Sequence, residues 1–167
     1  MKLLITGWIE FKQIIKLKSE ILKNKLKNLL EDHIYEDLTN KSYKKNIILA
    51  RKLISPNRID LGFRILFLEL KKKNLNLAEK IYLEHLRALT FSTFTEKGHT
   101  NKNSKEKYIR TFNFLFENIK KYGFNEKKSL IPIEKSKSIL NGSHRLAIAI
   151  FLNINVSTIS IEKDKLF

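Results

Sequence analysis

The stretch that decides the fold reads ILNGSHRLAIAI and occupies residues 139–150. Two apolar residues lead into a polar Asn-Gly-Ser turn, and an apolar segment with helical character follows. Gly142 permits a tight turn, and Ser143 is a good N-cap for a helix that begins at His144. At such a junction, unpaired backbone N–H groups and the positive end of the helix dipole point to one place. His144 and Arg145 could add donors and charge there, which is the chemistry of a phosphate site.

A plainer interpretation of this turn is a solvated surface arginine and a histidine without a chemical role, the commoner case for an isolated His-Arg pair. The complete run of turn glycine, helix cap, two cationic side chains and apolar helix favours the phosphate site. We therefore predict ligand binding by Asn141, Gly142, Ser143, His144 and Arg145.

The order Gly142-Ser143-His144-Arg145, after an apolar strand and before an alanine-containing helix, resembles the signature of the ParB/sulfiredoxin-like superfamily. That superfamily includes chromosome-partition CTPases, sulfiredoxins and small-molecule serine kinases, in which the equivalent turn contacts nucleotide phosphates. The wider pattern resembles a bacterial subgroup associated with surface-polysaccharide gene clusters. Its motifs match Arg58 to Asp60, Tyr82 to His85, Gly123-Phe124, Ile131 to Ile133 and Gly142 to Arg145, within residues 56 to 162.

This resemblance implies a nucleotide-binding domain that takes ATP or CTP, with Mg²⁺ as the accompanying ion. It favours a kinase-like phosphotransferase, which moves a phosphoryl group to a small hydroxyl compound in cell-surface polysaccharide metabolism. Arg145 and the amides of the turn would hold phosphate oxygens, while His144 would add charge or relay a proton. Glu84 and Asp60 are the carboxylates that we nominate for the catalytic chemistry, with His85 as a further candidate. The sequence indicates no metal-ligating residues.

The composition narrows the chemistry further. A chain of 167 residues with 43% hydrophobic content can form one folded domain with a sizeable core. It has no cysteine, so disulfides, thiolate metal sites and a cysteine nucleophile are excluded. Ser143 occupies the position of the sulfiredoxin cysteine, and the resemblance therefore does not extend to thiol redox chemistry.

The net charge of +16 makes nucleic acid a possible but not favoured partner. The excess of Lys and Arg is spread along the chain, and such a field also attracts nucleotides, anionic glycans or membrane surfaces. One alternative function is a non-catalytic, nucleotide-sensing DNA-binding module of ParB type. Against it, no helix-turn-helix pattern follows the nucleotide-binding region.

Residues Ile9 to Leu30 carry apolar positions at helical spacing with lysines largely on the other side, which predicts a basic amphipathic helix. It could pack on the core, or serve a membrane- or partner-associated accessory protein, a second alternative function. No apolar run approaches the roughly 18 residues that span a bilayer, and Met1 to Ile9 lacks the features of a secretory signal. We expect a cytoplasmic protein; the sequence does not indicate its oligomeric state.

The expected fold is α+β, with a helical N-terminal arm (1–54) packed on a ParB/sulfiredoxin-like domain (55–167) built around a β-hairpin–helix–strand unit. A polar segment over 90–104 is expected to be a lid, a binding loop or a disordered connection. The expected helices are Lys44 to Leu53, Ile59 to Lys73, Asn76 to Leu89, Lys105 to Tyr122 and Ser143 to Leu152, and the expected strands are Ser129 to Ile133, Ser138 to Leu140 and Val156 to Ile161.

Overall fold

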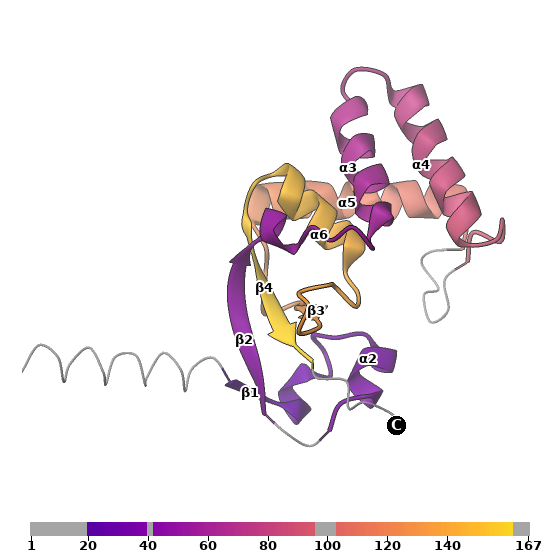
Figure 1. The fold of residues 1–167 in the computed structure, drawn as a ribbon. Coiled ribbons are helices and arrows are strands. Elements are labelled where there is room, and N and C mark those ends of the chain that lie inside the picture. Colours follow the sequence, from indigo (N-terminus) through magenta and orange to yellow (C-terminus); the bar gives the residue numbers. More distant parts are fainter. Residues whose placement is uncertain (1–19, 40–41, 96–102, 162–167) are drawn as a thin grey trace, which may run out of the picture.

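The protein combines a mixed sheet on one side with the long helices gathered toward the other (Figure 1), in a computed structural model that describes residues 20–39, 42–95 and 103–161. Within these residues the sheet has four strands in the order β1-β2-β4-β3. β2 is antiparallel to both β1 and β4, whereas β3 is parallel to β4. The expected α+β class is thus confirmed. The strands are β1 (Glu20–Leu22), β2 (Ser42–Leu49), β3 (Ile131–Ile133) and β4 (Asn155–Ser160).

The sequence-based prediction of a helix over Lys44 to Leu53 is wrong. Ser42–Leu49 is an interior strand, paired with β4 from Lys45↔Ile159 to Leu49↔Asn155, and only the short η2 (Ala50–Leu53) is helical. A short apolar run bounded by polar residues does not distinguish a buried helix from a strand by its periodicity. The partner β4, far away in sequence, decides the outcome.

The predicted amphipathic helix over 9–30 fails in its described part. Its first residues, 9–19, lie outside the described residues, but the chain then forms β1 and the single-turn η1 (Lys23–Leu26). A short helix α2 (Asp32–Glu36) follows. The described part before residue 55 is therefore not a helical arm, because it supplies two strands of the same sheet.

The later helices agree with the sequence within a few residues at their ends. Asn74 and Ser104 cap α4 and α5 through their side chains, and α5 ends at Gly123, whose φ of 73° favours glycine. The segment between α4 and α5 was expected to be a binding loop, and its residues 96–102 lie outside the described residues. These helices are α3 (Ile59–Leu70), α4 (Leu75–Leu89), α5 (Lys105–Tyr122) and α6 (Ser143–Phe151).

Helix α6 lies at the centre of the packing. Leu146, Ala147, Ile148 and Ala149 are all fully buried, which is typical of a helix enclosed on all sides. One side of α6 packs with α3 and the sheet, while Ile148 joins an aromatic cluster formed with α3, α4 and α5. Helix α6 therefore contacts both the sheet and the other long helices.

The buried face of helix α3 agrees only in part with the face that the sequence predicts. Hydrophobic spacing places Ile59, Leu66 and Phe67 on the core face, but Ile59 and Leu66 are 72% and 39% exposed. Phe67 is buried as expected, and Leu61 and Arg64 are buried with it. Hydrophobic spacing alone does not reveal a buried arginine, because Arg64 is buried together with an ion-pair partner on its own helix.

The predicted strand over Ser138 to Leu140 is wrong, because this segment makes only a single bridge to β3 on its way to the start of α6. An antiparallel bridge joins Ile133 to Ile139, and Leu140 N donates to the Pro132 carbonyl at 2.9 Å. Pro132 lies in β3, which is last in the strand order, as expected for a proline that cannot donate to a sheet. Within the described ranges, no helix combines the length and apolarity needed to cross a bilayer.

Candidate anion-binding site

The turn before α6 has the predicted tight geometry with a different cap. Gly142 is the N-cap residue, with φ 89° and ψ 24°, in the left-handed region that favours glycine. Its backbone N–H is bound by the Asn141 side chain, whose amide group also donates to Glu31. The prediction of Ser143 as N-cap is wrong: Ser143 is the first helical residue, and its hydroxyl accepts a hydrogen bond from Arg58.

The three side chains that follow Gly142 point in three directions. Successive residues of a helix are about 100° apart, so neighbours at its start need not share a ligand. Ser143 lines a pocket together with Asn141, Arg145 lines a separate pocket, and His144 enters the aromatic cluster. The structure thus divides the five predicted binding residues rather than gathering them around one phosphate.

His144 is held among aromatic side chains. Its Nε2 lies 2.7 Å from the hydroxyl oxygen of Tyr82, a fully buried residue. Its ring also meets the Phe112 ring edge-on, with centroids 4.9 Å apart. These contacts join α6 to α4 and α5, and the structure does not bring His144 into the pocket lined by Ser143.

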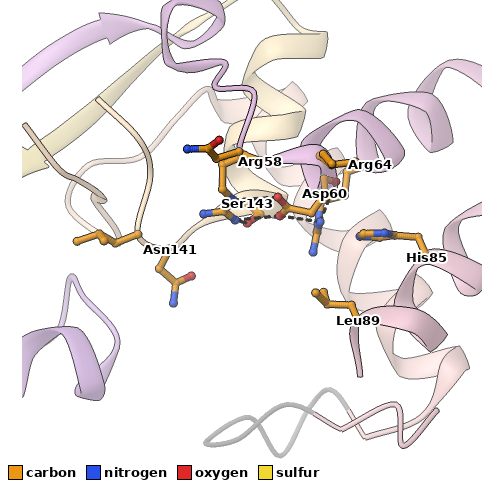
Figure 2. A pocket seen from close by; sticks show the side chains of 10 residues that line it. Arg58, Asp60, Arg64, His85, Leu89, Asn141 and Ser143 are labelled. Carbon is orange, nitrogen blue, oxygen red and sulfur yellow. Dashed lines mark hydrogen bonds and ion pairs between the residues drawn. The ribbon is translucent and has the colours of Figure 1, made fainter. Parts of the chain in front are cut away.

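Arg58, Asp60 and Arg64 form an ion cluster that ties α3 to this turn (Figure 2). The Asp60 carboxylate accepts two hydrogen bonds from Arg58 and one from Arg64, each at 2.9 Å. Arg58 also donates to the Ile139 carbonyl at 2.6 Å and to the Ser143 hydroxyl. The cluster therefore fixes the position of α3 relative to residues 139–143.

The environment of Asp60 strongly favours its ionised form. Burial alone would raise the pKa of this carboxyl, but the Arg58 hydrogen bonds and the charges of Arg64 and Arg58, together with Ser143, outweigh it. The pKa of Asp60 is lowered from 3.8 to about 2 as a result. Such a carboxylate is a weak base near neutral pH.

A pocket of about 510 Å³ opens between this ion cluster, the Asn141–Ser143 turn and α4. Its lining carries two arginines, Arg58 and Arg64, and a single carboxylate, that of Asp60, so the wall has a net positive charge. The positive end of α6 adds to it, because Ser143 is the first helical residue. The pocket is therefore suited to an anion.

His85 lines the same pocket from α4 (Figure 2). Its ring stacks on Phe63 with centroids 4.4 Å apart, and its buried Nε2 has no hydrogen-bond partner among the described residues. Burial lowers the pKa of His85 and the charge of Arg64 lowers it further, while Asp60 opposes the shift. His85 is hence a neutral imidazole at pH 7, able to accept a proton.

Glu84 lies elsewhere. Its carboxylate forms an exposed ion pair with Arg87 at 2.8 Å and does not line the pocket. The adjacent His85 is on the pocket side of α4, as the angular spacing of neighbouring helical residues allows. Of the two nominated carboxylates, the structure brings only Asp60 to the candidate site.

The pocket does not fit a Mg²⁺ ion held by protein side chains. Asp60 is its single carboxylate, and both carboxylate oxygens are engaged by arginines. No group of three or more potential ligands among His, Asp and Glu occurs in the part of the chain that the structure describes. Magnesium prefers several oxygen ligands, which the side chains of this pocket do not offer.

Sequence reasoning missed Arg64 and gave Arg58 no role of its own. One signal was present: Asp60 and Arg64 are four residues apart in a predicted helix, a spacing that favours ion pairing. The hydrogen bonds from Arg58 to Ile139 and Ser143 join residues more than 80 positions apart. Contacts of this kind produce no recognisable pattern in a single sequence.

No match was found when the chain was compared with protein-family models, curated proteins and solved structures. The resemblance to the ParB/sulfiredoxin-like superfamily therefore stays a prediction based on the motifs themselves.

The substitution Gly142→Ala is expected to lower the free energy of unfolding by about 1–3 kcal/mol. An added Cβ would lie 3.0 Å from Ile131 Cδ1 and 3.1 Å from Arg145 Nη2, at a φ of +89° that side chains disfavour. Urea unfolding measures the loss, with Gly62→Ala as the control, since nothing lies within 4 Å of an added Cβ at Gly62. A loss no greater than in the control would contradict the predicted strain.

Proposed function

We propose that the pocket at the start of α6 binds a nucleotide through its phosphates. The observation that carries this proposal is the net positive lining: Arg58 and Arg64 against Asp60, beside the N-terminus of α6. A phosphate would supply the negative charge that this wall lacks. The buried position of Arg64 strengthens its charge–charge interactions, because less water screens them.

Different groups around the pocket would contact different parts of the nucleotide. Backbone N–H groups in the first turn of α6 would donate to phosphate oxygens. Arg58, whose donors already bind Asp60, Ile139 and Ser143, would hold the turn in place and contribute charge. The apolar side chains of Ile59 and Leu89 in the lining offer contact surface to the remainder of a nucleotide.

We further propose that the bound nucleoside triphosphate donates its terminal phosphoryl group to a small hydroxyl compound, as the superfamily resemblance implies. The acceptor oxygen would form the new P–O bond while the bond to the nucleoside diphosphate breaks. The acceptor's proton would pass to the His85 imidazole, which replaces Glu84 as the candidate base. A role in cell-surface polysaccharide metabolism belongs to the same proposal.

A charge-insertion variant tests the nucleotide site. Asn57 is exposed and lines the pocket, so Asn57→Asp adds a negative charge with almost no change of shape. The expected result is an affinity at least tenfold lower, or about 1.4 kcal/mol, for whichever of ATP, CTP or GTP raises the melting temperature of the wild type. Calorimetric titration with and without Mg²⁺ provides the affinity.

The matched control is Asn125→Asp, the same change at an exposed residue that lines a different pocket. It should leave nucleotide affinity within about twofold of the wild type, once allowance is made for the small change in net charge. Equal weakening in both variants would contradict binding at the proposed site, and no binding of any nucleotide would overturn the proposal. In the latter case, steeply salt-dependent binding to duplex DNA would favour the ParB-type alternative.

A further inference from the structure

A second pocket, of about 550 Å³, lies at the C-terminal end of α5. The last two turns of α5 form one wall, the segment 123–129 forms another, and Arg145 reaches it from α6. This pocket shares no lining residue with the one that contains Ser143. It therefore offers a separate place for a ligand.

Arg145 reaches this pocket without a hydrogen bond or close ion pair to another described residue, although the charge of Glu31 acts on it. No described residue forms a hydrogen bond or an ion pair with its guanidinium group, whose Nη2 would lie 3.1 Å from a Cβ at position 142. Burial lowers the pKa of Arg145, and the charge of Glu31 raises it. An arginine remains charged at neutral pH, and a charge withdrawn from water is costly unless an anion pairs with it.

The side chains around Arg145 are suited to contact a planar aromatic ligand. The rings of Phe114 and Tyr122 are each 69% exposed and lie along the pocket, with Phe124 beside them. The buried hydroxyl of Ser129 also lacks a hydrogen-bond partner among the described residues. Exposed aromatic rings offer apolar contact, and the guanidinium group of Arg145 and the Ser129 hydroxyl beside them offer hydrogen-bond donors for specific recognition.

We propose that this pocket binds a small aromatic carboxylate, with Arg145 holding the carboxylate group. The planar guanidinium matches a carboxylate in bidentate geometry, and the rings of Phe114 and Tyr122 would contact the aromatic body. Glu31, close enough to influence Arg145, opposes a second negative charge. A singly charged carboxylate therefore fits better than a doubly charged phosphate. This site does not depend on the proposed nucleotide pocket.

The probe is 1-naphthoate, titrated by calorimetry into the wild-type chain and into Arg145→Gln. The expected result is binding to the wild type and at least about tenfold weaker binding to the variant, because a charged hydrogen bond is lost. The neutral analogue 1-naphthylmethanol should bind the wild type more weakly than 1-naphthoate and lose little in the variant. Naphthyl phosphate should bind no more tightly than 1-naphthoate.

The variant Asn125→Asp tests the same pocket and does not require Arg145→Gln to fold. Asn125 is exposed, and an aspartate there can still accept the hydrogen bond from the Lys127 backbone N–H. Asn125→Asp should weaken 1-naphthoate about tenfold by charge repulsion, whereas Asn57→Asp should not. Equal affinity in wild type and Asn125→Asp, equal binding of the neutral analogue, or no binding of 1-naphthoate would each overturn the proposal.

Discussion

Replacing Asp60 with alanine is expected to lower the free energy of unfolding by about 3–5 kcal/mol, because it leaves a buried charge without its counterion. Arg64 is only 4% exposed, and both it and Arg58 donate to this carboxylate. The loss would also release the ties from Arg58 to Ile139 and Ser143 that position the start of α6. Urea unfolding followed by circular dichroism provides the measurement.

Glu84→Gln is the matched control, since it removes a carboxylate from an exposed ion pair. Its side chain is 57% exposed, and such a pair contributes at most about 1 kcal/mol. If the stability of Asp60→Ala fell no further than that of Glu84→Gln, the ion cluster would not be the structural tie described above.

The stability that Asp60 provides should depend on pH with a definite sign. Its pKa is about 2 in the folded chain against an ordinary 3.8, so its contribution is complete above pH 3.8 and is lost as the pH falls toward 2. A shift of this size corresponds to about 2.5 kcal/mol. The difference in stability between wild type and Asp60→Ala should therefore narrow over this interval, and a constant difference would contradict the assigned pKa.

Phe112→Ala should have a comparable effect, lowering the free energy of unfolding by about 3–5 kcal/mol. The Phe112 ring is fully buried and contacts the rings of Phe67, Tyr82 and His144. Its removal leaves a cavity where α5 meets α3, α4 and the start of α6. The same unfolding measurement tests this expectation.

Phe114→Ala, two residues further along α5, serves as the control. Its ring is 69% exposed, so truncation should change stability by no more than about 0.5 kcal/mol. Similar losses in the two variants would mean that the aromatic cluster does not hold α5 against α6.

The sequence predicted best those parts of the fold whose signals are local. Caps and periodicity predicted the observed bounds of α5, and the Asn-Gly turn with its flanking apolar segments predicted the start of α6. Where long-range pairing decides, local signals failed: Ser42–Leu49 becomes a strand because β4 and β1 lie on either side of it. A propensity argument has no access to those partners.

The candidate site could be predicted only in part for a related reason. Sequence indicated where the turn and its glycine would be, and both Asn141 and Ser143 line the pocket. It did not indicate which way each side chain would point: His144 packs on Tyr82 and Phe112, and Arg145 faces a second pocket. Directions around the first turn of a helix depend on what the rest of the chain packs against it.

The pairing of β2 with β4 has a consequence for how the chain folds. Thr158 and Asn46, joined across these strands, are 112 residues apart in sequence. Closing so long a loop costs chain entropy before the contact contributes any favourable free energy. A high contact order therefore slows folding. During synthesis, the helices from α3 to α5 can emerge and associate while β2 still lacks β4. The edge of β2 that pairs with β4 stays open until almost all of the described chain has been made, and in this interval the strand is most exposed to aggregation.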